Sequence, residues 1–196
     1  MVALFSKDSI IRRNMKFDFA RFPEKVAELN RLHKLVHELG DLRWKSGKDE
    51  DIARWEKAVG DWRAFSGFGY PGDKFYIFEN EDFLAELSSG ESEVKKTAIK
   101  FLEFDPYYYR SGYIKAKLLV RLKNIRLSDS EAGRLRQVVC NAIVSRQPKS
   151  EFKYYARLLK NIGTPEFYQR LQNLSVPEIP YIKSRLECCL QPVYWQ

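Results

Sequence analysis

Histidine and cysteine are scarce in this chain: its 196 residues contain two His and three Cys. The cysteine count is odd, and Cys188 and Cys189 are adjacent, so we expect no disulfide framework. Cys140 stands beside Val139 and near Ala142 in a helical pattern, which favours a small buried hydrophobe over a nucleophile. We therefore expect three reduced thiols in a cytoplasmic protein.

Long apolar runs are also lacking. No stretch approaches the roughly 20 apolar residues that cross a bilayer, and the N-terminal MVALFSKDSIIRRN has no cleavage site of small residues. We expect neither a membrane span nor a signal peptide. With 44% hydrophobic and 31% charged residues, the composition is typical of a globular protein. The length predicts a single domain over residues 1–196.

No catalytic motif is convincing. Gly67, Gly69 and Gly72 spell G-x-G-x-x-G, but Pro71 lies inside the motif, a helical pattern precedes it and the only candidate strand follows it. A dinucleotide site needs the opposite order, so a turn-rich loop is the better interpretation. No serine stands in a nucleophile elbow. We expect no catalytic residues and no cofactor, and hence a protein that is not an enzyme.

The two histidines, His33 and His37, are four residues apart, a spacing that can place two imidazoles on one metal ion. The surrounding HKLVHE is not the HEXXH pattern of zinc proteases. By helical angle both lie on the polar flank of an apolar stripe. The sequence favours a solvated helix face, and we expect no metal site.

Apolar residues recur at helical spacing along most of the chain. The sequence predicts a mainly α fold with at most one short strand or hairpin near residues 74–78. The N-terminal half, 1–104, is the less regular, and residues 105–191 form a stack of helix pairs. The expected helices span about 23–39, 49–65, 81–88, 91–104, 106–125, 128–143, 150–162, 164–174 and 180–190, with Gly40 as a stop signal and Ser128, Ser150 and Thr164 as caps.

A weak internal repeat supports the stack. Residues 118–137 resemble residues 154–172: in each, a helix ends in LKNI, a capped turn follows, and a basic helix begins. The LKNI segments are 37 residues apart, a spacing in the range of two-helix repeats. We therefore expect HEAT-like stacking of helix pairs, with an irregular helical bundle as the alternative.

The sequence FDPYYYRSGYI, residues 104–114, holds four tyrosines and an arginine. Asp105 is a good N-cap and Pro106 a good first helical residue, so we expect a helix to start here. Helical angle places Tyr107 on the core stripe. It places Tyr109 and Tyr113 on a second stripe, away from that core.

The chain has 34 Lys and Arg against 26 Asp and Glu, and the excess is local. Between Pro106 and Leu127 there are six cations and no acid. The candidate binding residues are Tyr109, Arg110, Tyr113, Lys117 and Arg121. Three interpretations remain open: both tyrosine stripes pack in the core; the surface binds an acidic protein, since Tyr and Arg are enriched at interface hot spots; or the tyrosines stack on nucleic-acid bases while the cations pair with phosphates.

Residues 104–172, from FDPYYYRSGYIKAKLLVRLKNI to EFKYYARLLKNIGTPEF, resemble a helical segment of small uncharacterised bacterial proteins. The size and architecture are similar to those of helical, HEAT-like immunity proteins that neutralise secreted bacterial toxins. This likeness implies a stoichiometric binder and carries over no catalytic residue. We therefore expect a non-catalytic immunity or antitoxin protein whose partner is acidic, for example a toxin domain. The alternative is a protein that binds RNA or DNA through the same surface.

Overall fold

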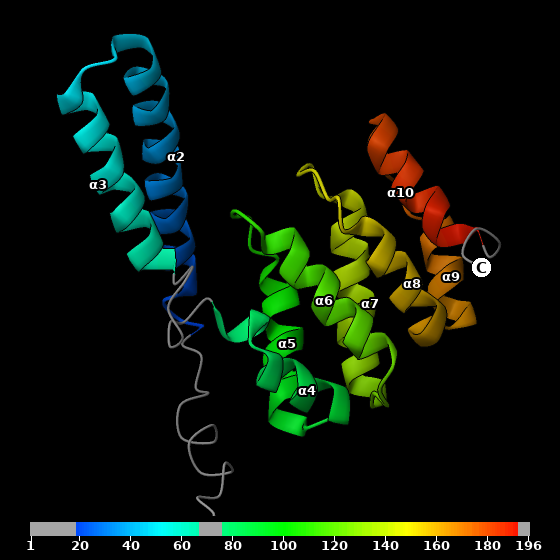
Figure 1. The fold of residues 1–196 in the computed structure, drawn as a ribbon. Helices are drawn as coiled ribbons and strands as arrows, with labels where there is room; N and C mark the ends of the chain where they lie inside the picture. Colours follow the sequence, from blue (N-terminus) through cyan, green and yellow to red (C-terminus); the bar gives the residue numbers. More distant parts are fainter. Residues whose placement is uncertain (1–18, 67–75, 192–196) are drawn as a thin grey trace, which may run out of the picture. The chain divides into compact units, whose positions relative to one another are not determined.

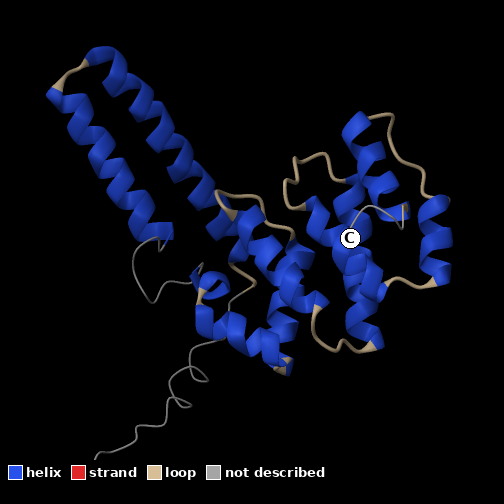
Figure 2. Ribbon diagram, turned by 45° about the vertical axis from the view of Figure 1, so that its right-hand side comes forward, coloured by secondary structure: helices blue, strands red, loops and turns tan. Residues whose placement is uncertain are grey.

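A computed structural model of the protein describes residues 19–66 and 76–191. These residues form helices joined by short connections, with no β-strand among them, which confirms the mainly α prediction (Figure 2). The predictions for the N-terminal residues 1–18 and the glycine motif at 67–72 lie outside the described residues, as do residues 192–196. Two compact units divide the chain, 1–62 and 63–196.

The first unit is built on the helix α2 (Phe22–Ser46) and most of α3 (Asp49–Ser66) (Figure 1). The expected stop at Gly40 is wrong: α2 continues to Ser46, and Gly47 ends it with a φ of 62°. A Cβ at Gly40 would lie 3.5 Å from the indole nitrogen of Trp55 on α3. Trp55 thus packs at ordinary van der Waals distance over Gly40, and α2 continues through this residue although glycine costs about 1 kcal/mol in a helix interior.

The second unit stacks helices in two layers (Figure 1). In one layer, each helix contacts the next along the series α4 (Glu81–Ser89), α6 (Ser111–Lys123), α8 (Phe152–Ile162) and α10 (Pro180–Leu190). In the other layer α5 (Ser92–Phe104) packs against α7 (Asp129–Val144), and α9 (Pro165–Gln172) contacts α10. The alternation of layers along the chain is that of stacked helix pairs. Because α4 and α5 pack with α6 and α7, residues on both sides of position 104 belong to this unit.

The two LKNI segments end neighbouring parallel helices. At the N-terminal ends of α6 and α8, a Cβ at Gly112 would lie 3.1 Å from a carboxylate oxygen of Glu151. At the C-terminal ends, Asn161 Nδ2 donates a hydrogen bond to the carbonyl oxygen of Lys123 over 2.7 Å. The internal repeat thus corresponds to two helices that lie side by side in the same direction.

The expected helix start at Asp105 and Pro106 is wrong. Helix α5 runs to Phe104, and Asp105 ends it in the left-handed region with a φ of 45°. Helix α6 begins only at Ser111. The carboxylate of Asp105 does not cap a helix because the ammonium groups of two buried lysines, Lys115 and Lys149, bind it.

The prediction that Tyr107 packs in the core is also wrong. Tyr108 is buried, whereas Tyr107 is 52% exposed. The backbone N–H of Tyr108 donates to Ser111 Oγ, and the backbone N–H of Ser111 donates to the carbonyl oxygen of Tyr108. This tight turn, with Arg110 at a φ of 66°, turns the aromatic ring of Tyr108 inward instead of that of Tyr107.

Most of the other helix starts agree with the sequence. Ser128 and Glu131 form the expected capping box, and Thr164 caps α9. Ser150 does not cap α8, whose N-cap position is held by Glu151. Near the candidate strand, residues 76–79 form a short 3₁₀ helix instead. Phe78 is fully buried there, against the rings of two other phenylalanines.

Candidate interaction surface

The structure exposes the two candidate tyrosines. Tyr113, in the first turn of α6, is 71% exposed, and Tyr109, just before the helix, is 48% exposed. The interpretation that both tyrosine stripes pack in the core is therefore wrong. Val120 shares the exposed side of α6.

The three candidate cations are placed differently. Lys117 and Arg121 follow Tyr113 at successive turns of α6, and both are half-buried. Arg121 Nη1 donates to the carbonyl oxygen of Lys117 over 3.3 Å, which fixes the guanidinium along the helix. Arg110 instead lies with Nη2 3.2 Å from a carboxylate oxygen of Glu79. The structure thus groups Tyr113, Lys117 and Arg121 and turns Arg110 toward an acid.

Helix α8 brings a second set of cations beside the first, which the sequence analysis missed. Lys153 and Lys160 are exposed, and Tyr154 and Arg157 are half-buried. Lys153 Nζ lies 5.2 Å from the ring centre of Tyr154, and the guanidinium carbon of Arg157 lies 5.6 Å from it. These distances allow cation–π attraction, which orients both cations around the ring.

We call this combined surface the basic face. Helix α6 lies over α5 and α8 over α7, so the outer sides of the two parallel helices face the same way. Neither helix contains an Asp or Glu. The basic face consists of Tyr113, Lys117 and Arg121 on α6 and Lys153, Tyr154, Arg157 and Lys160 on α8.

Acids limit the basic face on both sides. Glu81 and Asp82 are exposed on α4, which neighbours α6. Glu187 is exposed on α10, which neighbours α8. A groove leads from Lys153 toward α10 and is also lined by Arg146 and Tyr181, with no acid among its lining residues. Exposed acids therefore occur on both helices that neighbour the basic face, and positive charge continues toward α10 along this groove.

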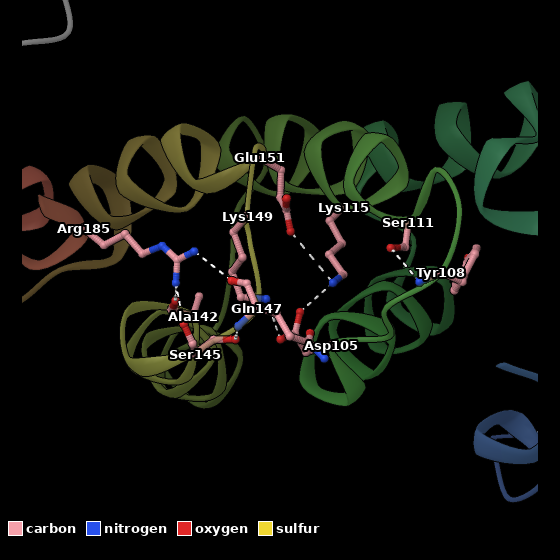
Figure 3. Close-up of polar contacts among 10 residues, drawn as sticks. All are labelled: Asp105, Tyr108, Ser111, Lys115, Ala142, Ser145, Gln147, Lys149, Glu151 and Arg185. Atoms are coloured by element: carbon pink, nitrogen blue, oxygen red, sulfur yellow. Dashed lines mark hydrogen bonds and ion pairs between the residues drawn. The ribbon is translucent and has the colours of Figure 1, made fainter. Parts of the chain in front are cut away.

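Beneath the ends of α6 and α8 lies a cluster of four charged side chains, which we call the buried ion cluster (Figure 3). The two carboxylate oxygens of Asp105 each lie 2.6 Å from an ammonium group, Oδ1 from that of Lys115 and Oδ2 from that of Lys149. Lys115 Nζ also lies 3.8 Å from Glu151 Oε1. The lysine side chains are only 2% and 1% exposed. Two positive and two negative groups make the cluster electrically balanced.

Burial lowers the pKa of Lys115, and the charge of Lys149 acts in the same direction, while Asp105 and Glu151 oppose both. A lysine with a lowered pKa is a feature of amine catalysis. Here, however, the ammonium group is enclosed and bound to carboxylates. The cluster connects the end of α5 with α6 and with the start of α8, so we interpret it as a structural link that keeps α6 and α8 aligned.

Arg185 on α10 binds the C-terminal end of α7, next to the buried ion cluster. Its guanidinium donates to the carbonyl oxygens of Ala142, Ser145 and Gln147 at 3.3, 2.6 and 2.8 Å (Figure 3). These carbonyl groups belong to the last turn of α7 and to the residues after it. Burial lowers the pKa of Arg185. The residue thus supplies hydrogen bonds to carbonyl groups at the end of α7 that lack a partner within the helix, and it ties α10 to α7.

Two of the three cysteines are buried, and Cys188 is partly exposed. Cys140 is buried in α7, as predicted for a small hydrophobe, and burial raises the pKa of its thiol. Cys189 is buried in α10, and burial raises its pKa to about 12. Both thiols are therefore poor nucleophiles near neutral pH.

Within residues 19–66 and 76–191, no group of three or more His, Cys, Asp or Glu side chains is arranged to hold a metal ion. Over the same ranges, no helix has the length and apolar character needed to cross a membrane. No protein family, curated protein or solved structure matches the chain. The function of the chain is therefore inferred from the residues of the basic face and their geometry.

Proposed function

We propose that this chain is a non-catalytic binding protein that recognises an acidic protein surface through the basic face. The observation that carries the proposal is the pairing of α6 and α8, two parallel helices without a single acid, which together present five cations and two tyrosines. A positive patch of this kind attracts an acidic partner and speeds its association.

The tyrosines add apolar contact area, which charged side chains alone do not provide. Tyr113 projects from the start of α6, and Tyr107 and Tyr109 are about half exposed just before it. Tyrosine rings bury large apolar areas with little loss of side-chain entropy, and Tyr and Arg are enriched among residues that dominate binding energy. A protein partner would cover these rings and place its carboxylates over the cations of α6 and α8.

The interactions that hold α6 beneath the basic face also favour binding. The buried ion cluster and the Asn161–Lys123 hydrogen bond join α6 to its neighbours at both ends. A surface held in its binding geometry loses less conformational entropy when the partner arrives. The basic face is therefore suited to tight, stoichiometric binding of the kind that an immunity or antitoxin protein needs, and a toxin domain in the cytoplasm is the partner that we propose.

The limits of the positive region favour a protein over a nucleic acid. Acids on α4 and α10 stand on either side of the two basic helices. An extended polyanion that crossed the stack would meet Glu81 and Asp82, or Glu187, beyond them. A compact acidic patch on a protein fits between these limits without repulsion.

Capture from the native host with the tagged protein, followed by mass spectrometry, tests the proposal. The decisive comparison uses Lys117→Glu, Arg157→Glu and Lys160→Glu together against a control of equal charge change, Lys34→Glu, Lys57→Glu and Lys96→Glu. We expect a protein partner that the wild type and the control retain and that the variant of the basic face loses. Recovery of RNA or DNA in place of a protein would contradict the proposal, as would equal recovery by both variants.

A further inference from the structure

The two histidines of the chain converge on α2. His33 Nε2 and His37 Nε2 lie 3.2 Å apart, and the two rings are nearly perpendicular, with 88° between their planes. The sequence analysis favoured a solvated helix face for the two histidines over a metal site. In the structure, the two side chains come from successive turns of α2, and their Nε2 atoms face each other.

The distance between the two Nε2 atoms suits two imidazole ligands of one metal ion. Nitrogen–metal distances are about 2.0–2.1 Å for zinc and similar ions. Two nitrogens 3.2 Å apart then subtend an angle of about 100° at the ion, between the square-planar and the tetrahedral values. When both Nε2 atoms bind a metal ion, each neutral ring carries its proton on Nδ1, so the ring that now donates from Nε2 moves its proton to Nδ1.

The surroundings hold the pair in place while leaving it accessible. The ring of Trp62 on α3 lies 5.6 Å from that of His33, centre to centre, in a tilted arrangement. His33 is half-buried and His37 is exposed.

We propose that His33 and His37 form a two-ligand site for a divalent transition metal that prefers imidazole, such as Cu²⁺, Ni²⁺ or Zn²⁺. The protein contributes two nitrogens from one helix, and water or a group from a partner fills the other positions. The site lies in the first unit and is independent of the basic face. It agrees with the lack of larger ligand clusters in the described part of the chain, because it needs two side chains only.

The test uses CuSO₄, since Cu²⁺ binds most strongly in the series of first-row divalent ions. All proteins carry Cys188→Ser, because Cys188 is partly accessible and its thiol would compete for copper. Isothermal titration gives the stoichiometry and affinity, and electron paramagnetic resonance identifies nitrogen ligands. We expect one copper ion per chain with two imidazole nitrogens.

The matched control keeps the amino-acid composition of the protein and moves one imidazole to the next position on the helix. In the variant His37→Glu with Glu38→His, the second ring is turned by one residue, about 100° around the helix, and faces away from His33. Copper affinity is expected to fall by about tenfold or more, as it should in His33→Ala, because chelation by two tethered ligands is lost. Lys34→Ala, between the histidines, should leave binding unchanged. Equal affinity in the wild type and the exchanged variant would overturn the proposal, and so would the absence of copper binding by the wild type.

Discussion

Lys149 Nζ lies 2.6 Å from Asp105 Oδ2, although 44 residues separate the two side chains in the sequence. Asp105 ends α5, and Lys149 belongs to the connection that leads into α8. This contact, together with Lys115, brings the start of α8 to the start of α6. The alignment of the two basic helices therefore depends on these buried charges.

Asp105→Asn should destabilise the second unit by about 3–5 kcal/mol, because it leaves two buried ammonium groups with one remaining carboxylate. Asparagine has nearly the same shape and tolerates the left-handed φ of 45° at this position, so the effect of charge is isolated. Urea unfolding measures the change, with the exposed Glu187→Gln as control. A loss below about 1 kcal/mol, the size of an ordinary surface change, would contradict the role of the cluster.

Gly163→Ala should destabilise the fold by about 1–3 kcal/mol. A Cβ there would lie 2.7 Å from the ring of Tyr168 and 2.8 Å from the carbonyl oxygen of Leu159, and the backbone cannot move aside cheaply. The matched change Gly133→Ala inside α7 meets only a flexible arginine end at 3.6 Å. It should stabilise by about 0.5–1 kcal/mol through helix propensity. Opposite signs in thermal unfolding are the expected result, and equal effects would refute the geometry.

Glu131 should make stability depend on acid pH. Burial acts to raise its pKa, but hydrogen bonds from Ser128 and Lys95 outweigh burial and hold the pKa below the ordinary value of 4.5. The folded state therefore releases this proton more readily than the unfolded state, so the contribution is complete above pH 4.5 and is lost as pH falls through the lowered pKa. Glu131→Gln should cost about 1 kcal/mol at pH 7 and much less at pH 3. The same cost at both pH values would disprove the assignment.

Tyr113→Ala should separate binding from folding. The side chain is 71% exposed, so its removal should change the free energy of unfolding by no more than about 0.5 kcal/mol. Affinity for the captured partner should fall by about 1–2 kcal/mol if the ring belongs to the centre of the interface. Surface plasmon resonance and urea unfolding measure the two quantities. Loss of stability without loss of affinity would place Tyr113 outside the interface.

The parts of the fold set by neighbouring residues could be predicted from the sequence. The capping box of Ser128 and Glu131 and the cap at Thr164 follow from spacings of three residues, and both formed as expected. The 37-residue repeat also indicated that α6 and α8 are equivalent helices. Their parallel contact, and hence the cations of α8, required the tertiary structure. Sequence analysis therefore found only the α6 half of the basic face.

Interactions between distant residues account for the errors. Asp105 and Pro106 have the local signature of a helix start, but the partners of Asp105 lie 10 and 44 residues away, and their ion pairs outweigh a cap. Gly40 has the signature of a helix end, yet α2 continues to Ser46, and Trp55 of α3 packs over Gly40. In both cases packing decided the conformation against a weak local preference.

The most direct test of the central claim is the binding of the isolated partner to three forms of the protein: the wild type, the basic-face variant Lys117→Glu, Arg157→Glu and Lys160→Glu, and the control Lys34→Glu, Lys57→Glu and Lys96→Glu. Titration at low and high salt measures affinity, and circular dichroism verifies the helices. We predict that the basic-face variant loses at least about 100-fold in affinity at low salt while the control stays within about threefold of the wild type. Equal losses in the two variants would show that net charge alone governs binding and would contradict a site on α6 and α8.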